Sequence, residues 1–163
     1  MESLHELYVN GLKDLYSAEK QLVKALPRMA KAATSDELRK GFEAHLEETQ
    51  IQVERLEQIF EELGVSPRGK KCVGMEGLIE EGKELMEEED IEADVLDAGL
   101  IAAAQHVEHY EMAGYGCART YAKLLGFDEA HKLLQQTLDE EGATDKKLTQ
   151  LSQRINVQAQ RAA

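Results

Sequence analysis

The sequence contains few of the residues that interrupt helices, form disulfides or span membranes. Its 163 residues include two prolines, two cysteines, no tryptophan and 5% aromatic residues. Because prolines are rare and Glu, Leu, Ala, Lys and Gln dominate the long segments, we expect an all-α fold. Cys72 and Cys117 lack CxxC or Cys/His ligand spacing, so we expect two free thiols. No apolar run approaches the length of a membrane-spanning helix.

Basic residues are also scarce, with 19 Lys and Arg against 32 Asp and Glu and a net charge of -13. This charge would repel phosphate backbones and anionic lipid surfaces, so we expect neither nucleic acid nor a membrane as partner. The first residues, MESLHELYVNGLKDLY, carry acids where a signal peptide carries basic residues. We therefore expect a cytoplasmic protein. We also expect one domain over residues 1–163, because a chain of this length with 42% hydrophobic residues can form one substantial core.

Apolar residues recur at helical spacing along four long segments. These segments cover about residues 3–33, 35–63, 91–125 and 128–156. Ser35 is the expected N-cap of the second segment, and Gly64 and Gly126 are expected to end the second and third in a left-handed conformation. A shorter helix is expected at residues 75–89, inside the long connection. Two helical hairpins joined by one long crossover are the connectivity of the ferritin-like four-helix bundle.

Six carboxylates fall where the helical pattern calls for apolar residues. They are Glu19, Glu48, Glu108, Glu111, Glu141 and Asp145. The i,i+3 spacing places Glu108 and Glu111 on one side of their helix, and Glu48 is preferred to Glu47 because Glu47 points away from the apolar stripe. Buried ionised carboxylates are costly unless a strong counter-charge pairs with them. We therefore predict that the six side chains bind two metal ions.

The two halves of the chain repeat this arrangement faintly. Each half has one acid in its first helix, Glu19 or Glu108, and an acidic pair in its second, within HLEET or TLDEE. A centre with two metals and approximate two-fold symmetry needs matching oxygen donors from both hairpins.

Several segments resemble the YciE/YciF family of ferritin-like proteins, over nearly the full chain. They are LYSAEKQL, AHLEET, VERLEQ, KKCVGMEGLIEEG, LIAAAQHVEHYE and LLQQTLDEE. The resemblance implies a four-helix bundle with a short crossover helix, a homodimer, a bound metal pair and an association with bacterial stress responses. In the wider rubrerythrin-like pattern, Glu19, Glu48, Glu108, Glu111 and Glu141 fill the Glu positions. Ile51 stands where the second helix of that pattern has His, and Asp145 is the candidate replacement for the His of the fourth.

Hard oxygen donors with few imidazoles favour hard cations, so we expect iron, with manganese as the alternative. One hypothesis is a di-metal oxidoreductase that oxidises Fe(II) or reduces peroxide or O2, with a small oxidant or a metal ion as substrate. The other is a stress-induced structural or interaction protein in which the metals only staple the bundle. The residues leave both open. No nucleophile triad, phosphate loop or dinucleotide fingerprint is present.

Other polar residues near these positions have simpler interpretations. A single acid beside an apolar stripe usually reaches water, and only the convergence of six favours metal. We expect His45 to support a carboxylate by hydrogen bonding rather than to bind metal, and His106 and His109 to be interfacial or exposed. Tyr16 and Tyr115 are expected in the core, with a phenol–carboxylate bond as the alternative.

Overall fold

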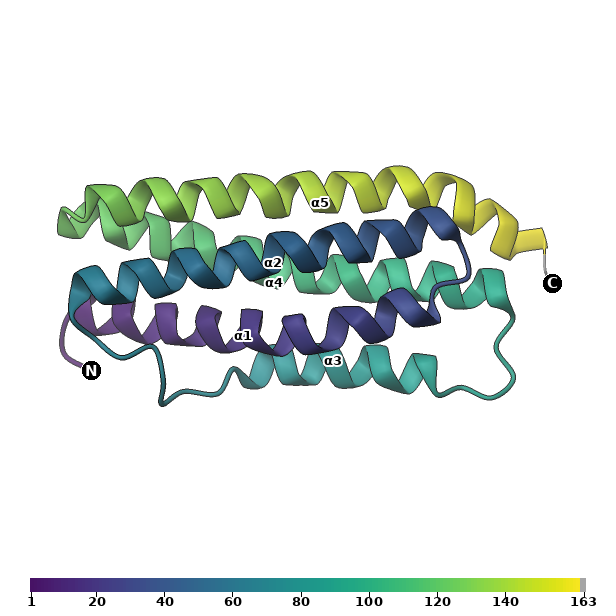
Figure 1. Cartoon of the computed structure of the whole chain (residues 1–163), viewed down its shortest axis with the longest axis horizontal. Coiled ribbons are helices and arrows are strands. Elements are labelled where there is room, and N and C mark those ends of the chain that lie inside the picture. Colours follow the sequence, from purple (N-terminus) through teal and green to yellow (C-terminus); the bar gives the residue numbers. More distant parts are fainter. Residues whose placement is uncertain (162–163) are drawn as a thin grey trace.

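The computed structural model describes residues 1–161, and all its regular elements in this range are helices. In chain order they are α1 (Leu4–Ala32), α2 (Asp36–Leu63), α3 (Val73–Met86), α4 (Ala93–Leu125) and α5 (Asp128–Arg161). The four long helices form a bundle with the short α3 outside it (Figure 1). The predicted all-α fold with a short crossover helix is confirmed. Residues 162 and 163 of the expected domain lie outside the described residues.

The helix ends follow the local signals in the sequence. The Ser35 hydroxyl accepts from the Leu38 amide at 3.4 Å and caps α2. Gly64 and Gly126 end α2 and α4 with φ values of 64° and 80°, a conformation that suits glycine. Helix α5 continues five residues past its predicted end, because residues 157–161 contain no glycine or proline to stop it.

Neighbouring long helices run in opposite directions. Helices α1 and α2 form one hairpin and α4 and α5 the other, while α1 also packs on α4 and α2 on α5. The crossover carries the chain from one end of the bundle back to the other, and α3 lies along α1 and α4 (Figure 1). None of the described helices combines the length and hydropathy of a membrane span.

The bundle has two hydrophobic clusters in its interior. One contains Leu22, Leu26, Phe42 and Leu100, and the other contains Tyr8, Leu12, Leu56, Phe60 and Tyr115. Along every long helix, the buried residues at the level between these two clusters are mainly polar. A buried polar layer therefore crosses the middle of the bundle, with an apolar cluster on each side.

The crossover is attached to the bundle by a buried cysteine. The Cys72 sulfur lies 3.1 Å from Asp14 Oδ2 and 2.9 Å from the Tyr110 hydroxyl, and the Tyr110 hydroxyl donates to Asp14 at 2.7 Å. A side chain at Gly74 would meet the Tyr110 ring at 2.6 Å, so glycine permits this close approach. Both cysteines are free, as expected, with Cys72 buried and Cys117 exposed.

Candidate metal centre

All four long helices contribute side chains to the polar layer, and its buried acids come from α1, α4 and α5. Its central members, here called the carboxylate cluster, are Glu19 on α1, His45 on α2, Glu108 and Glu111 on α4, and Glu141 on α5. All five are buried, and none of the four acids is more than 1% exposed. One ligand atom each from His45, Glu108, Glu111 and Glu141 lies within 4.8 Å of the other three. This spacing is compatible with a shared metal ion.

The cluster holds most of the buried side-chain atoms that lack a hydrogen-bond partner among residues 1–161. Buried side-chain atoms without a hydrogen-bond partner belong to Glu19, His45, Gln52, Glu108, Glu111 and Glu141, and otherwise only to the Tyr8 hydroxyl. Both oxygens of Glu111 and of Glu141 are in this group. Native proteins pair most buried polar atoms, so a concentration of unpaired ones in one place needs an explanation such as a bound ion.

The environment of the cluster opposes ionisation of its acids. Burial, together with the charge of Glu141, raises the pKa of Glu19 to about 8. Burial also raises the pKa of Glu108 to about 8, and it raises the pKa values of Glu111 and Glu141 well above their usual range. Neighbouring carboxylates add repulsion to the cost of desolvation. A multivalent cation would remove both penalties.

No Lys or Arg side chain in the described chain forms an ion pair with the cluster. The nearest ion pair along the sequence is between Arg55 and Glu140, with N–O distances of 2.5 and 2.7 Å. His45 Nε2 lies 3.1 Å from Glu108 Oε1, in an orientation that makes no hydrogen bond. The cluster therefore has no strong protein counter-charge, and its donors fit a metal ion.

A hydrogen bond from a tyrosine outside the cluster orients one of its carboxylates. The buried Tyr115 hydroxyl donates to Glu19 Oε1, which is the phenol–carboxylate bond considered as an alternative to plain core packing. Tyr16 is partly buried instead, and its hydroxyl donates to Glu57 at 2.8 Å, away from the cluster. Tyr115 thus fixes one oxygen of Glu19 and leaves the other without a partner.

Two of the six predicted ligands lie at the margin of the cluster. Glu48 is partly buried and accepts from Thr144 at 3.4 Å. Asp145 is 20% exposed, accepts from Gln105 Nε2 at 3.0 Å and lies 3.3 Å from His109 Nε2. The structure therefore brings together Glu19, Glu108, Glu111 and Glu141, and leaves both marginal acids with other partners.

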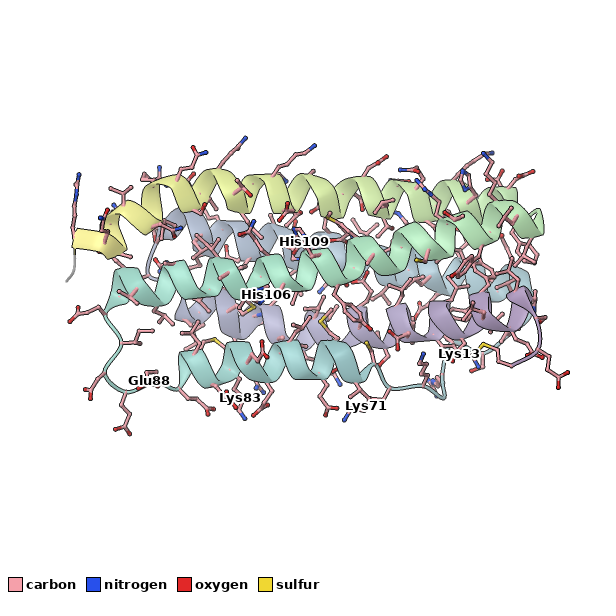
Figure 2. The ribbon with its side chains drawn as sticks, turned by 180° about the vertical axis from the view of Figure 1, so that it is seen from behind. Lys13, Lys71, Lys83, Glu88, His106 and His109 are labelled. Atoms are coloured by element: carbon pink, nitrogen blue, oxygen red, sulfur yellow. The ribbon has the colours of Figure 1, made fainter. Side chains whose placement is uncertain are left out.

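The side chains that sequence reasoning placed least well are His45 and Gln52. Neither is among the six predicted ligands, and His45 is predicted only to support a carboxylate by hydrogen bonding. His45 lies among the carboxylates, and the Gln52 amide donates to Glu140 at 3.3 Å while its oxygen has no partner. His106 and His109 are exposed, as expected, and lie along the outer side of α4 (Figure 2).

A small cavity opens beside the cluster between α2, α4 and α5. Its volume is about 70 Å³. His45, Glu48 and Glu108 line it together with apolar side chains such as Phe42 and Leu148. A water molecule occupies about 30 Å³ in the liquid, so the cavity has room for about two molecules of that size. It offers a small solute an approach to the cluster.

Comparisons with known proteins agree with this architecture. The model of the DUF892 family, described as a domain of unknown function, matches residues 3–161. Protein YciF of Escherichia coli strain K12 is 48% identical over 165 residues, which cover 100% of this chain and 99% of YciF. The crystal structure of the E. coli stress protein YciF matches with a TM-score of 0.91 at 49% identity, over 95% of this chain and 98% of that chain.

Two further solved structures are similar. YcfI of Rhodopseudomonas palustris, described as a candidate structural protein, has a TM-score of 0.87 at 44% identity, over 91% of this chain and 94% of that chain. A ferritin-like, diiron-carboxylate protein of Bacillus anthracis strain Ames has a TM-score of 0.72 at 16% identity, over 93% of this chain and 99% of that chain, which shows a shared fold. The chain belongs to the DUF892 family, and its predicted resemblance to YciF and to ferritin-like proteins is confirmed.

Proposed function

We propose that this chain is a di-metal carboxylate protein of the bacterial stress response that oxidises Fe(II) or reduces peroxide or O2. The observation that carries the proposal is the set of unpaired, buried carboxylate oxygens at the centre of the bundle. Such groups are too costly to keep in a dry interior for stability alone. A cation bound by the folded chain would supply the counter-charge that these carboxylates lack.

Glu19, Glu108, Glu111 and Glu141 are the proposed ligands, together with His45. Glu48 completes the set at the cavity side. Asp145 stays a predicted ligand, although it would have to leave Gln105 and His109 to reach a metal. Four carboxylates balance the charge of two divalent ions, and donors of this type favour iron or manganese over softer metals. A bound pair of Fe(II) ions would supply two electrons, which with two protons suffice to reduce hydrogen peroxide to water or O2 to hydrogen peroxide.

The chain's own residues would bind the metal ions, orient the ligands and shield the centre from bulk water. Glu111 and Glu141 would lose the protons that burial favours when the metals bind, because ligands must be deprotonated. Tyr115 would hold Glu19 in one orientation. The apolar clusters on both sides of the layer would exclude bulk water.

The small cavity supports turnover rather than a purely structural role for the metals. A staple can be saturated by protein ligands, whereas turnover requires that the oxidant reach the centre. The cavity leads to His45, Glu48 and Glu108 and has the size of two water molecules, which suits O2 or hydrogen peroxide. Larger substrates would not fit.

The relatives support the biological setting. YciF is described as a stress protein, and we extend that role to this chain. We also propose that the chain is cytoplasmic and forms a homodimer, as the family resemblance implies.

A structural role is the second candidate, because YcfI is described as a candidate structural protein and is 44% identical. Stopped-flow absorption distinguishes the two functions. Protein loaded anaerobically with Fe(II) is mixed with O2 or peroxide, and the metal content is measured in parallel. A rapid optical change that repeats with added Fe(II) supports the oxidoreductase. An inert centre whose removal only lowers the melting temperature supports the staple, and protein without stoichiometric metal contradicts both.

A further inference from the structure

A second cavity lies away from the carboxylate cluster, between α1, α3 and α4. Its volume is about 200 Å³. Its walls are apolar and include Met29 on α1, Leu78 and Met86 on α3, and Val107 on α4. Methionine side chains adapt readily to different apolar ligands. The bundle therefore contains an apolar space much larger than the one beside the proposed metal centre.

Basic residues surround this cavity in a chain that is otherwise acidic. Lys24 and Arg28 on α1 and Lys83 on α3 line it. Lys83 lies on α3, where Figure 2 labels it, and pairs with Glu80 at 2.8 Å. Within residues 1–161, neither Lys24 nor Arg28 has an acidic partner within 4.0 Å.

The local charge follows from the sequence of α1. Residues 20–31 include four basic residues and no acid, although the whole chain has a net charge of -13. Lys24 and Arg28 are both exposed, so they present two positive charges without a direct ion-pair partner among the described residues beside an apolar cavity. This combination matches a ligand with one anionic group and one apolar chain.

We propose that this cavity binds a straight-chain carboxylate of about eight carbons, with the chain between α1, α3 and α4 and the carboxylate at Lys24 and Arg28. A cavity of about 150 Å³ in another protein accommodates the six carbons of benzene, and a volume of 200 Å³ is in proportion for about eight. The inference does not depend on the proposed metal centre, because the two sites share none of their residues.

Methionine methyl NMR with octanoate tests the position of the ligand. The chain has five methionines, of which Met29 and Met86 line the cavity. Octanoate, added below the concentration at which it forms micelles, is expected to shift the Met29 and Met86 methyl signals saturably. The Met1 and Met112 signals are expected to stay unchanged. Shifts at all the methionines, or at none, would overturn the proposal.

A cavity-filling variant tests the apolar part. Gly82 lies on α3 at the cavity wall, where an added Cβ meets only Ala103 at 3.8 Å. Gly82→Leu should fill the space and weaken octanoate binding about tenfold or more. Gly77→Leu is the matched control, because this glycine is exposed on the same helix with nothing within 4 Å of its Cβ position. Equal octanoate affinity in these two variants, each with a helical circular dichroism spectrum like that of the parent, would contradict the site.

A charge variant tests the anionic part. Lys24→Ala/Arg28→Ala should weaken octanoate about fivefold and leave 1-octanol unaffected, since exposed ion pairs contribute modestly. Lys40→Ala/Lys146→Ala removes the same charge from exposed positions that do not line the cavity, and should change neither affinity. Equal affinity for octanol and octanoate in the parent protein would exclude recognition of the carboxylate. Binding to anionic lipid vesicles in place of free octanoate would also overturn the proposal.

Discussion

At the scale of single residues, two adjacent glutamates illustrate how the fold separates stability from function. Burial raises the pKa of Glu141 well above its usual range, and its carboxylate has no hydrogen-bond partner. Burial acts in the same direction on Glu140, but the two-pronged ion pair with Arg55 outweighs it, so the pKa of Glu140 is lowered overall. Glu140 therefore stabilises the contact between α2 and α5. Glu141 contributes a buried acid whose ionised form has no counter-charge other than a bound metal.

This contrast gives a matched pair of variants. Glu141→Gln should reduce the metal content below two ions per chain and should stabilise the metal-free protein at pH 8 by about 1–3 kcal/mol, because it removes a buried acid that is ionised at this pH in the unfolded chain and whose ionisation the folded state opposes. Glu140→Gln should keep the metal content and destabilise the protein by about 1–3 kcal/mol, because Arg55 loses its partner. Elemental analysis and urea unfolding measure both. Full metal content in Glu141→Gln would argue against its role as ligand.

A second prediction concerns the tyrosine that contacts the cluster. Tyr115→Phe removes the hydrogen bond to Glu19, and the metal affinity should fall about tenfold, as is typical when a residue that orients a ligand is lost. Competition with a chelator measures the affinity. Tyr16→Phe is the control, because that hydroxyl bonds Glu57 at the surface. An equal effect of the two substitutions would show that Tyr115 has no specific part in metal binding.

At the scale of helices, local signals could be read from the sequence and contacts between distant segments could not. Ser35, Gly64 and Gly126 act on the helix that contains or precedes them, so their roles were predictable. Asp97 could not be identified in this way. Its buried carboxylate on α4 accepts from the Thr34 amide at 2.8 Å and from the Thr34 hydroxyl and Ser35 amide at 2.7 Å, across more than 60 residues of chain.

Asp97 should therefore join the two hairpins at one end of the bundle. Asp97→Ala leaves three donors at the α1–α2 turn without this acceptor and is expected to destabilise the protein by about 2–4 kcal/mol. Asp94→Ala, at an exposed position in the first turn of the same helix, should cost less than about 1 kcal/mol. Denaturant unfolding of the metal-free protein compares them. Similar losses in both variants would contradict the assigned role of Asp97.

At the scale of the whole molecule, the apolar pattern of the helices predicted where the buried layer lies better than it predicted which side chains belong to it. Glu19, Glu108, Glu111 and Glu141 could be recognised because each follows the inward stripe of its own helix. The environment of His45 depends on the rotation of three other helices, so its position among the acids was not readable from one stripe. The apolar cavity beside Met29 and Met86 likewise depends on how α3 packs against α1 and α4.

The stability of the whole molecule should depend on pH in a way that reports the metal. The pKa values of Glu19 and Glu108 are raised to about 8 from an ordinary value of 4.5, so the folded metal-free protein binds more protons than the unfolded chain between these values. Its stability should increase as the pH falls from about 8 toward 5. Below that range, loss of the Arg55–Glu140 pair should reverse the trend, because the pKa of Glu140 is lowered.

Melting curves from pH 5 to pH 9 measure this dependence. The metal-free protein is expected to melt several degrees higher at pH 6 than at pH 8, whereas the metal-loaded protein should lose this trend because its ligands are already deprotonated. A metal-free protein that is most stable at pH 8 would mean that the acids ionise without a metal in the folded state.

The most direct measurement is a crystal structure of the metal-loaded protein with anomalous scattering recorded at the iron and manganese edges. We expect two ions in the polar layer, bound by Glu19, Glu108, Glu111 and Glu141, with His45 and Glu48 beside them. Absence of anomalous scattering in this layer, or ions only at exposed acids, would contradict the proposed metal centre.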